Sequence, residues 1–278
     1  MEVCAVCKDK MQPVFVLRIL QKHNVQCFHC SSCGFVRTEK PYWLNEAYSS
    51  AIAMTDTGIM ERNMVIANKL ACLLFYCLEP NGTYLDVGGG YGILTRLMRD
   101  YGFDYYWEDK HCQNLVARGF EAANASLPFV SMSAFEVIEH TEDPVAFVAE
   151  LMERHCCRTL VFTTETYSSR TGPRSDWWYL SPATGQHISF FECRTLACIA
   201  SRLHLAFHSY AGLHLFTDKS LRNRWVLRLP GLGRQSGPLG VIVKRRMGSR
   251  VWADHMAMSR GAVSTNPESA ASLEIELP

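Results

Sequence analysis

A glycine-rich stretch near residue 90 restricts the possible folds of this chain more than any other feature. Residues 83–87, TYLDV, have the length and composition of a buried strand, and residues 92–102, GILTRLMRDYG, have the pattern of a helix that ends at a glycine. The stretch LDVGGGYG (85–92) therefore joins a strand to a helix. Glycines at such a turn let the backbone approach a ligand closely, and the helix start offers free N–H groups. We expect a ligand-binding loop of an α/β sheet; the alternative is a tight turn that binds nothing.

The spacing of these glycines distinguishes between kinds of cofactor loop. A dinucleotide-binding loop has the pattern G-x-G-x-x-G, but the position that should hold its third glycine is Ile93. The pattern that fits is D-x-G-x-G-x-G, formed by Asp86, Gly88, Gly90 and Gly92. The sequence therefore does not favour a dinucleotide.

Strand-like and helix-like segments alternate after the loop. Strands are predicted over residues 104–109, 129–135 and 158–164, helices over 143–156 and 193–205, and two further strands over 205–218 around Ala211–Gly212. This alternation predicts a doubly wound α/β fold, with a mostly parallel sheet that carries helices on both faces and an antiparallel edge hairpin. A strand is also expected between residues 110 and 128, but no segment there has a clear strand pattern.

The cysteines are concentrated at the start of the chain. Five of the 12 lie within the first 33 residues, and four of them form the pairs Cys4-x-x-Cys7 and Cys30-x-x-Cys33. Two such pairs suit a structural Zn²⁺ held by four thiolates, and they favour it over a disulfide framework or a redox pair. Cys27 and His29 are spare ligands that could substitute. We expect the ion to stabilise a segment too short to fold alone.

Polar side chains follow the predicted strand 129–135, at the stretch FEVIEH. Glu136, Glu139 and His140 come there within one possible helical turn, and such groups are costly to bury without partners. Because ligands bind at the carboxyl ends of parallel strands, we expect these residues beside the glycine loop. A long segment, 168–187, follows the next strand and ends at His187; its Trp177, Trp178 and Tyr179 would form either a substrate wall or part of the core.

The glycine loop, with Asp86 before it, resembles motif I of the class I S-adenosylmethionine-dependent methyltransferases. The resemblance implies a mostly parallel, seven-stranded, Rossmann-like sheet, with Asp86, Gly88, Gly90 and Gly92 around the methionine end of the cofactor. An acidic residue after the second strand would bind the ribose hydroxyls, and Asp109 fits this position, with Glu108 as its rival. The cysteine pairs, GQHISFF and TDTGIMERN (55–63) are similar to one bacterial branch of these enzymes, which carries an N-terminal zinc-binding module.

This family assignment implies a division of the chain into four parts. Residues 1–40 would form the zinc module, 41–80 a helical connector, and 81–230 the methyltransferase domain. Residues 231–278 would be a C-terminal extension without a sustained period, whose last 20 or so residues we expect to be disordered.

FEVIEHTEDP resembles a motif that follows a strand in several methyltransferase branches, among them the enzymes that methylate the terminal 2′-hydroxyl of small RNAs. In those RNA enzymes two glutamates and a histidine, with a later histidine, hold a divalent metal. The matching residues here are Glu136, Glu139, His140 and His187. A metal there would lower the pKa of the accepting hydroxyl. Without a metal, His140 or His187 would act as general base.

Composition limits the choice of substrate. The net charge is +1, which gives no electrostatic case for nucleic acid or a membrane surface, and the start of the chain lacks the pattern of a secretory signal. Together with the family resemblance, this leads us to expect a cytoplasmic enzyme that methylates a polar small molecule at a hydroxyl of a sugar or catechol-like compound. The alternatives are methylation of an RNA terminus and a non-catalytic cofactor-binding scaffold. The sequence does not indicate an oligomeric state.

Overall fold

The computed structural model of the chain describes residues 2–48, 56–228 and 238–265. Its larger sheet has six strands in the order β5-β4-β6-β7-β10-β9. The first four are parallel to one another, and β10 is antiparallel to both β7 and β9. The strands are β4 (Thr83–Val87), β5 (Asp104–Glu108), β6 (Phe129–Phe135), β7 (Thr159–Thr163), β9 (Ala206–Tyr210) and β10 (Leu213–Thr217).

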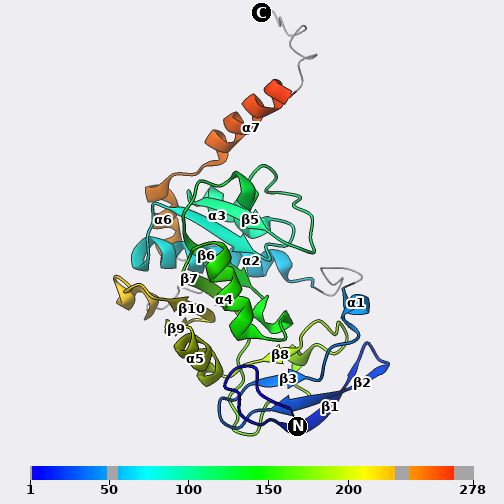
Figure 1. The fold of residues 1–278 in the computed structure, drawn as a ribbon. Coiled ribbons are helices and arrows are strands. Elements are labelled where there is room, and N and C mark those ends of the chain that lie inside the picture. The colour runs from blue at the N-terminus through cyan, green and yellow to red at the C-terminus, as the bar shows by residue number, and fades with distance from the viewer. Residues whose placement is uncertain (1, 49–55, 229–237, 266–278) are drawn as a thin grey trace, which may run out of the picture.

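Helices cover both faces of this sheet (Figure 1). One face packs against α2 (Ile59–Cys72), its π-helical continuation Leu73–Cys77, and α3 (Ile93–Asp100). The other packs against α4 (Pro144–Arg154) and α5 (Cys193–Arg202). The doubly wound α/β class with an antiparallel edge hairpin is therefore confirmed. Within the described residues, no helix is long and apolar enough to cross a membrane.

In the part of the chain that the structure describes, the sheet has six strands rather than seven, because the segment between β5 and β6 forms turns. It contributes only a short 3₁₀ helix, Ala122–Asn124, and an isolated bridge between Trp107 and Glu121. Side chains of the segment bind its own backbone: Asn114 Oδ1 accepts from Ala117 N at 2.9 Å, and Glu121 Oε2 accepts from Gly119 N at 3.0 Å. These local bonds occupy N–H groups that a strand would offer to β5.

The N-terminal residues form a second, four-stranded antiparallel sheet in the order β1-β2-β3-β8. Its strands are β1 (Gln12–Ile19), β2 (His23–His29), β3 (Val36–Thr38) and β8 (Ser189–Phe190). The fourth strand comes from the main domain, so residues 1–40 do not complete this sheet by themselves. A short helix, α1 (Leu44–Ala47), follows, and Figure 1 shows the sheet at the end of the molecule opposite α7.

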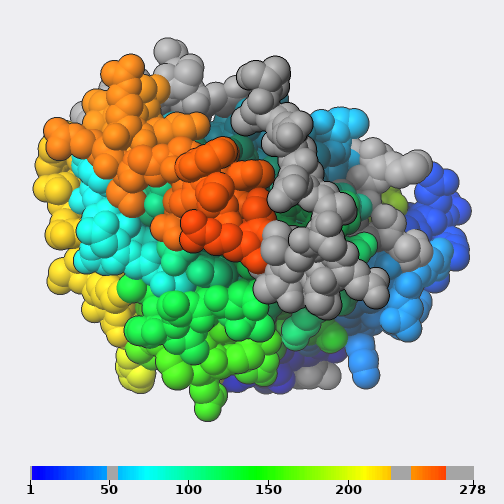
Figure 2. Space-filling view, turned by 90° about the horizontal axis from the view of Figure 1, so that it is seen from above, coloured from blue at the N-terminus to red at the C-terminus, as the bar shows by residue number. Residues whose placement is uncertain are grey.

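Two helices occupy residues 238–265, in a region where the sequence has no sustained period. They are α6 (Pro238–Met247) and α7 (Val251–Thr265), and Figure 2 shows both on one face of the molecule. Helix α7 is held by Asp254, whose carboxylate receives two bonds of 2.7 Å from the buried Arg99 of α3. The anchor is an ion pair rather than an apolar stripe, which explains why periodicity did not predict the helix. The expected disorder of the chain end concerns mainly residues 266–278, which lie outside the described residues.

Candidate active site

Three glycines of the glycine loop have left-handed backbone conformations. Gly88, Gly90 and Gly92 have φ values of +67°, +54° and +87°, which residues with a Cβ rarely adopt. A Cβ on Gly88 would also lie 2.7 Å from Cγ2 of Val137, in the segment that follows β6. The loop is therefore closely packed against the neighbouring strand end and leaves its free side to a ligand.

Asp86, at the end of β4, is buried under this loop. Its carboxylate accepts hydrogen bonds from Ser133 Oγ at 2.8 Å and from Thr95 Oγ1 at 3.4 Å. Burial raises the pKa of Asp86 to about 7, and the two hydroxyls oppose this only in part. A cationic group of a ligand would therefore be a favourable partner for this carboxylate.

Asp109 and Glu108, the two candidates after β5, have different surroundings. Asp109 Oδ2 accepts from Gly90 N at 2.9 Å, and its Oδ1 accepts from the backbone N–H groups of His111 and Cys112 at 2.7 and 2.8 Å. Glu108 instead forms an ion pair with Arg154 of α4. Asp109 thus contacts the glycine loop, whereas Glu108 connects β5 to α4.

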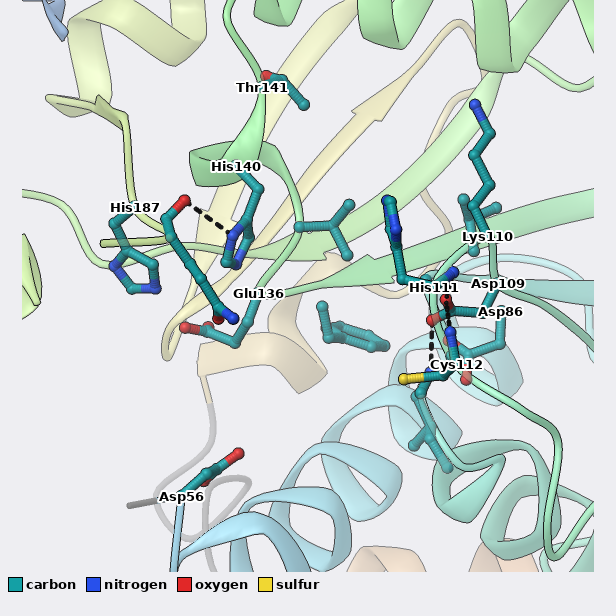
Figure 3. A pocket seen from close by; sticks show the side chains of 18 of the residues that line it. Asp56, Asp86, Asp109, Lys110, His111, Cys112, Glu136, His140, Thr141 and His187 are labelled. Carbon is teal, nitrogen blue, oxygen red and sulfur yellow. Dashed lines mark hydrogen bonds between the residues drawn. The ribbon is translucent and has the colours of Figure 1, made fainter. Parts of the chain in front are cut away.

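A single pocket of about 1320 Å³ connects the glycine loop to the FEVIEH segment. In Figure 3, Asp86 and Asp109 lie on one side of it, and Glu136, His140 and His187 lie on the other. Asp86 and His187, the outermost of these predicted residues, are 101 positions apart in the sequence but line the same cavity.

Glu136 is the first residue after β6 and has an unusual backbone, with φ at +54°. Its Oε1 accepts from Thr163 Oγ1 at 2.7 Å, and its Oε2 accepts from the Tyr179 hydroxyl at 2.9 Å. The left-handed conformation separates it from the 3₁₀ helix Ile138–His140 that follows. Glu136 therefore does not share a helical face with Glu139 and His140, although the spacing suggested one.

Glu139 is fully buried beside it. The Tyr179 hydroxyl also contacts Glu139 Oε1, while Oε2 has no hydrogen-bond partner among the described residues. Burial, together with the nearby Glu136 carboxylate, raises the pKa of Glu139 well above its ordinary value. A buried carboxyl oxygen without a partner is unfavourable, and a cation would remove the penalty.

In both histidines of the site, the ring atom Nδ1 lies beside a backbone carbonyl oxygen. His140 Nδ1 lies 3.0 Å from the carbonyl oxygen of Gln186, and His187 Nδ1 lies 2.7 Å from that of Tyr179. Because a carbonyl oxygen only accepts, we assign the proton to Nδ1 in both rings, which leaves a lone pair on each Nε2. Burial lowers the pKa of both, to about 3 for His140, so both are neutral.

Glu139, His140 and His187 bring their ligand atoms together. One such atom from each lies within 4.8 Å of those of the other two, and Glu136 is not in this group. Metal-binding histidines usually donate their second N–H to a carbonyl or carboxylate, as both rings do here. A carboxylate with two imidazoles suits Mn²⁺, Fe²⁺ or Zn²⁺ better than Mg²⁺.

The four predicted cysteines lie together in the N-terminal part of the structure, and none of them lines the pocket. Cys4 Sγ is 3.6 Å from Cys33 Sγ, and Cys7 Sγ is 3.3 Å from Cys30 Sγ. Tetrahedral zinc thiolates have sulfurs about 3.8 Å apart, so the group fits the ion closely. Cys27 lies in the apolar core of the N-terminal sheet, and neither it nor His29 is in the cysteine group.

Sequence reasoning missed Tyr48 as a site residue, and it missed the contact of Tyr179 with the two glutamates. Tyr179 was expected to belong to either a wall or the core; it is buried, and its hydroxyl lies between the two glutamates. Its neighbour Trp178 is 72% exposed and lines the pocket. Tyr48 places its hydroxyl 2.8 Å from His140 Nδ1, and no spacing in the sequence indicated this contact.

Comparison with known proteins gives a family for this fold and site. A family model described as "Methyltransferase domain" matches residues 60–210, which is more than half of the chain. A search of curated proteins found no significant match.

Several solved structures are similar to this chain at low identity. TnmH is 16% identical with a TM-score of 0.44, and the match covers 64% of this chain and 60% of TnmH. An O-methyltransferase family 2 protein from Planctomyces limnophilus, solved with apigenin, is 12% identical with a TM-score of 0.41, and coverage is 62% and 63%. The small RNA methyltransferase HEN1 is 17% identical with a TM-score of 0.39, and coverage is 62% and 27%. The chain thus spans less than two thirds of each of these proteins.

Proposed function

The chain belongs to the methyltransferase-domain family, and from this premise we propose that it transfers the methyl group of S-adenosylmethionine to a hydroxyl of a polar small molecule. The observation that carries the proposal is the shared pocket, which has the glycine loop at one side and His140 and His187 at the other, with the buried Glu139 within 4.8 Å of both histidines. When bound, the cofactor supplies a methyl group on a positively charged sulfur.

The residues of the loop fit this cofactor. Its ammonium group would pair with the Asp86 carboxylate, which has no cationic partner of its own in the described structure. Asp109, whose oxygens already accept backbone N–H groups, would use its remaining lone pairs for the ribose hydroxyls. Gly88, Gly90 and Gly92 would leave room for the cofactor backbone, because a side chain at these φ values is unfavourable.

At the acceptor side, Glu139 Oε2 and the two Nε2 atoms would hold a divalent metal. When bound, the metal lowers the pKa of a coordinated hydroxyl. The residues of the chain would then orient the acceptor: the carbonyls of Gln186 and Tyr179 keep both rings in the required tautomer. Glu136, on the pocket wall, would accept the hydroxyl proton at a carboxylate oxygen. In a metal-free alternative, Nε2 of His187 or His140 would accept that proton.

Charge in the pocket favours a small acceptor over an RNA terminus. Two of the basic residues that line it are already paired with acids, Arg62 with Asp56 and Arg154 with Glu108. Such pairs leave little positive charge for phosphates. The four cysteines would hold a structural Zn²⁺ in the N-terminal module.

Two experiments test the proposal. Calorimetric titration with S-adenosylmethionine should give saturable binding, and the absence of binding at millimolar cofactor would refute the enzyme assignment. Incubation with labelled cofactor and a library of hydroxylated metabolites should then identify the acceptor by transfer of label.

Variants separate the metal-assisted from the metal-free reaction. Glu139→Gln should lower Mn²⁺ affinity and turnover together, because it removes one of three ligands. Glu142→Gln is the matched control, an exposed residue of the same segment that does not line the pocket. Full activity in Glu139→Gln, or in enzyme whose Mn²⁺ has been chelated, would leave only the metal-free reaction.

A further inference from the structure

The N-terminal sheet extends into the segment that carries His187. Strand β3 pairs with β8 through Val36↔Phe190 and Arg37↔Ser189. Ile188, one residue before β8, bonds to both neighbouring segments through its backbone. Its carbonyl oxygen accepts from Thr38 N of β3 at 3.0 Å, and its N–H donates to the carbonyl oxygen of Glu139 at 2.9 Å. His187 is the adjacent residue, so its backbone lies between the N-terminal sheet and the FEVIEH segment.

Further contacts from the N-terminal residues hold this segment along its length. Trp43 Nε1 donates to Gly185 O at 2.8 Å, and Leu20 N donates to Pro182 O at 2.9 Å. Gln186 Nε2 donates to Ala47 O at 2.9 Å. The same region has a shared apolar core, in which residues of β1–β3 and α1 pack with Tyr167, Tyr179, Leu180, Ile188 and Phe190.

These contacts bear directly on the two histidines of the site. The carbonyl that receives the His140 proton belongs to Gln186, and the one that receives the His187 proton belongs to Tyr179. Both carbonyls are therefore in the part of the chain that the N-terminal sheet supports. A shift of this segment would change the orientation of both rings.

The cysteine knuckles are attached to the main domain on their other side. Thr195 of α5 donates to Cys33 O at 2.8 Å, and Arg194 Nη1 donates to Ser31 O at 2.8 Å and Ser32 O at 3.2 Å. Tyr167 donates to Gly34 O. An ion held by four thiolates would fix the geometry of these backbone loops, and through β3 that of β8.

We propose that the four-cysteine group acts at a distance as a positioning device for the His140 and His187 rings. Binding of Zn²⁺ to Cys4, Cys7, Cys30 and Cys33 keeps β3 paired with β8, and this pairing holds the carbonyls of Gln186 and Tyr179 against the two Nδ1 atoms. Loss of Zn²⁺ therefore weakens the Glu139–His140–His187 site, although no cysteine contributes to it. The effect on metal affinity rests on the function proposed above; the effect on the rings does not.

The test uses the full chain with Cys30→Ser and Cys33→Ser together, and Cys156→Ser, an exposed cysteine outside both sites, as the control. Elemental analysis measures Zn²⁺, hydrogen exchange measures opening of residues 185–191, and NMR of ¹⁵N-labelled histidine measures the ring tautomers. Electron paramagnetic resonance measures Mn²⁺ binding, and loss of that binding in His187→Asn assigns it to this site.

In the double cysteine variant we expect loss of Zn²⁺ and hydrogen exchange at residues 185–191 that is faster by about tenfold or more. We also expect altered NMR signals of His140 and His187, and an Mn²⁺ affinity lower by about tenfold.

A second variant covers the case in which the double cysteine variant does not fold. Trp43→Phe leaves every cysteine in place and removes the N–H that bonds to Gly185 O. It should retain Zn²⁺ but show the same changes at 185–191 and in the rings to a smaller extent; Trp225→Phe, at an exposed tryptophan, is its control.

The outcomes separate the two proposals. A folded, Zn²⁺-free variant whose exchange rates and histidine signals equal those of the wild type would overturn the positioning role, as would a silent Trp43→Phe. Absence of Mn²⁺ binding in the wild type would instead reject the metal-assisted reaction, while the exchange rates and histidine signals still decide the positioning role.

Discussion

Replacement of Asp254 by Asn tests how α7 is held to the body of the protein. Arg99 Nε and Nη2 each donate to one Asp254 oxygen at 2.7 Å, and Arg96 Nη1 donates to Oδ2 at 3.0 Å. The Arg99 side chain is only 2% exposed, and its guanidinium carbon lies 3.7 Å from the centre of the Phe120 ring. Asn keeps the shape of Asp254 but removes its charge, so the variant leaves a buried cation with one charged partner fewer.

The magnitude follows from this burial. Removal of one partner of a buried ion pair costs about 3–5 kcal/mol of unfolding free energy. Arg99 retains Asp104 Oδ1 and Tyr105 O, each at 2.9 Å, so we expect a loss near the lower end of this range. For a chain of this size, a loss of about 3 kcal/mol corresponds to a fall in Tm of about 6–12 °C.

Thermal and urea unfolding followed by circular dichroism measure the change. The control is Asp218→Asn, which breaks the exposed pair between Asp218 and Arg158, whose side chains are 43% and 47% exposed. This variant should lose less than about 1 kcal/mol. If Asp254→Asn cost no more than this control, the buried pair would not be what holds α7, and the reasoning would fail.

Three further predictions concern the pocket. Gly88→Ala should weaken S-adenosylmethionine binding by about tenfold or more in calorimetry, because it places a Cβ on a residue with φ at +67°. The control Gly58→Ala should leave binding unchanged, because a Cβ at Gly58 has open space around it. Cofactor binding should weaken by about an order of magnitude when the pH falls from 7.5 to 5.5. Burial raises the pKa of Asp86 to about 7, so protonation below that pH removes the charge that attracts the ammonium group. Asp86→Asn should bind the cofactor weakly and without this pH dependence. Tyr179→Phe should lower Mn²⁺ affinity about 10-fold to 100-fold, because it removes the hydroxyl that contacts Glu139, and an unchanged affinity would contradict that supporting role.

The central strands β4 and β6 could be predicted from local sequence, because each is a short, mostly apolar run of the kind that is buried in a sheet. β4 and β6 begin and end at the predicted residues, since each is a short apolar run bounded by turn-forming or polar residues. β8 has only two residues and exists because β3 lies beside it, which no local pattern reports. Helix α7 depends on the pair between Asp254 and Arg99, 155 positions apart in the sequence.

The site was predictable to the extent that strand ends determine it. Asp86 lies near the end of one parallel strand, and Asp109 and His140 follow two others, so their shared edge could be inferred from topology. The spacing of the FEVIEH segment suggested one face for all three polar residues, but the left-handed backbone of Glu136 turns it away from the other two. Tyr179 reaches Glu139 from a loop 40 positions further along, and only tertiary structure brings them together.

The pairing of β3 with β8 also constrains how the chain folds during synthesis. Val36 and Phe190 are more than 150 residues apart in sequence, so the cysteine knuckles leave the ribosome long before their partner strand exists. At about 5–20 residues per second, this interval lasts roughly 8–30 seconds. During that time the edge of β3 lacks its partner strand, and closing so long a loop makes the pairing a late event. Early capture of an ion by the four thiolates would order the cysteine loops beside β3 before the histidine segment is synthesised.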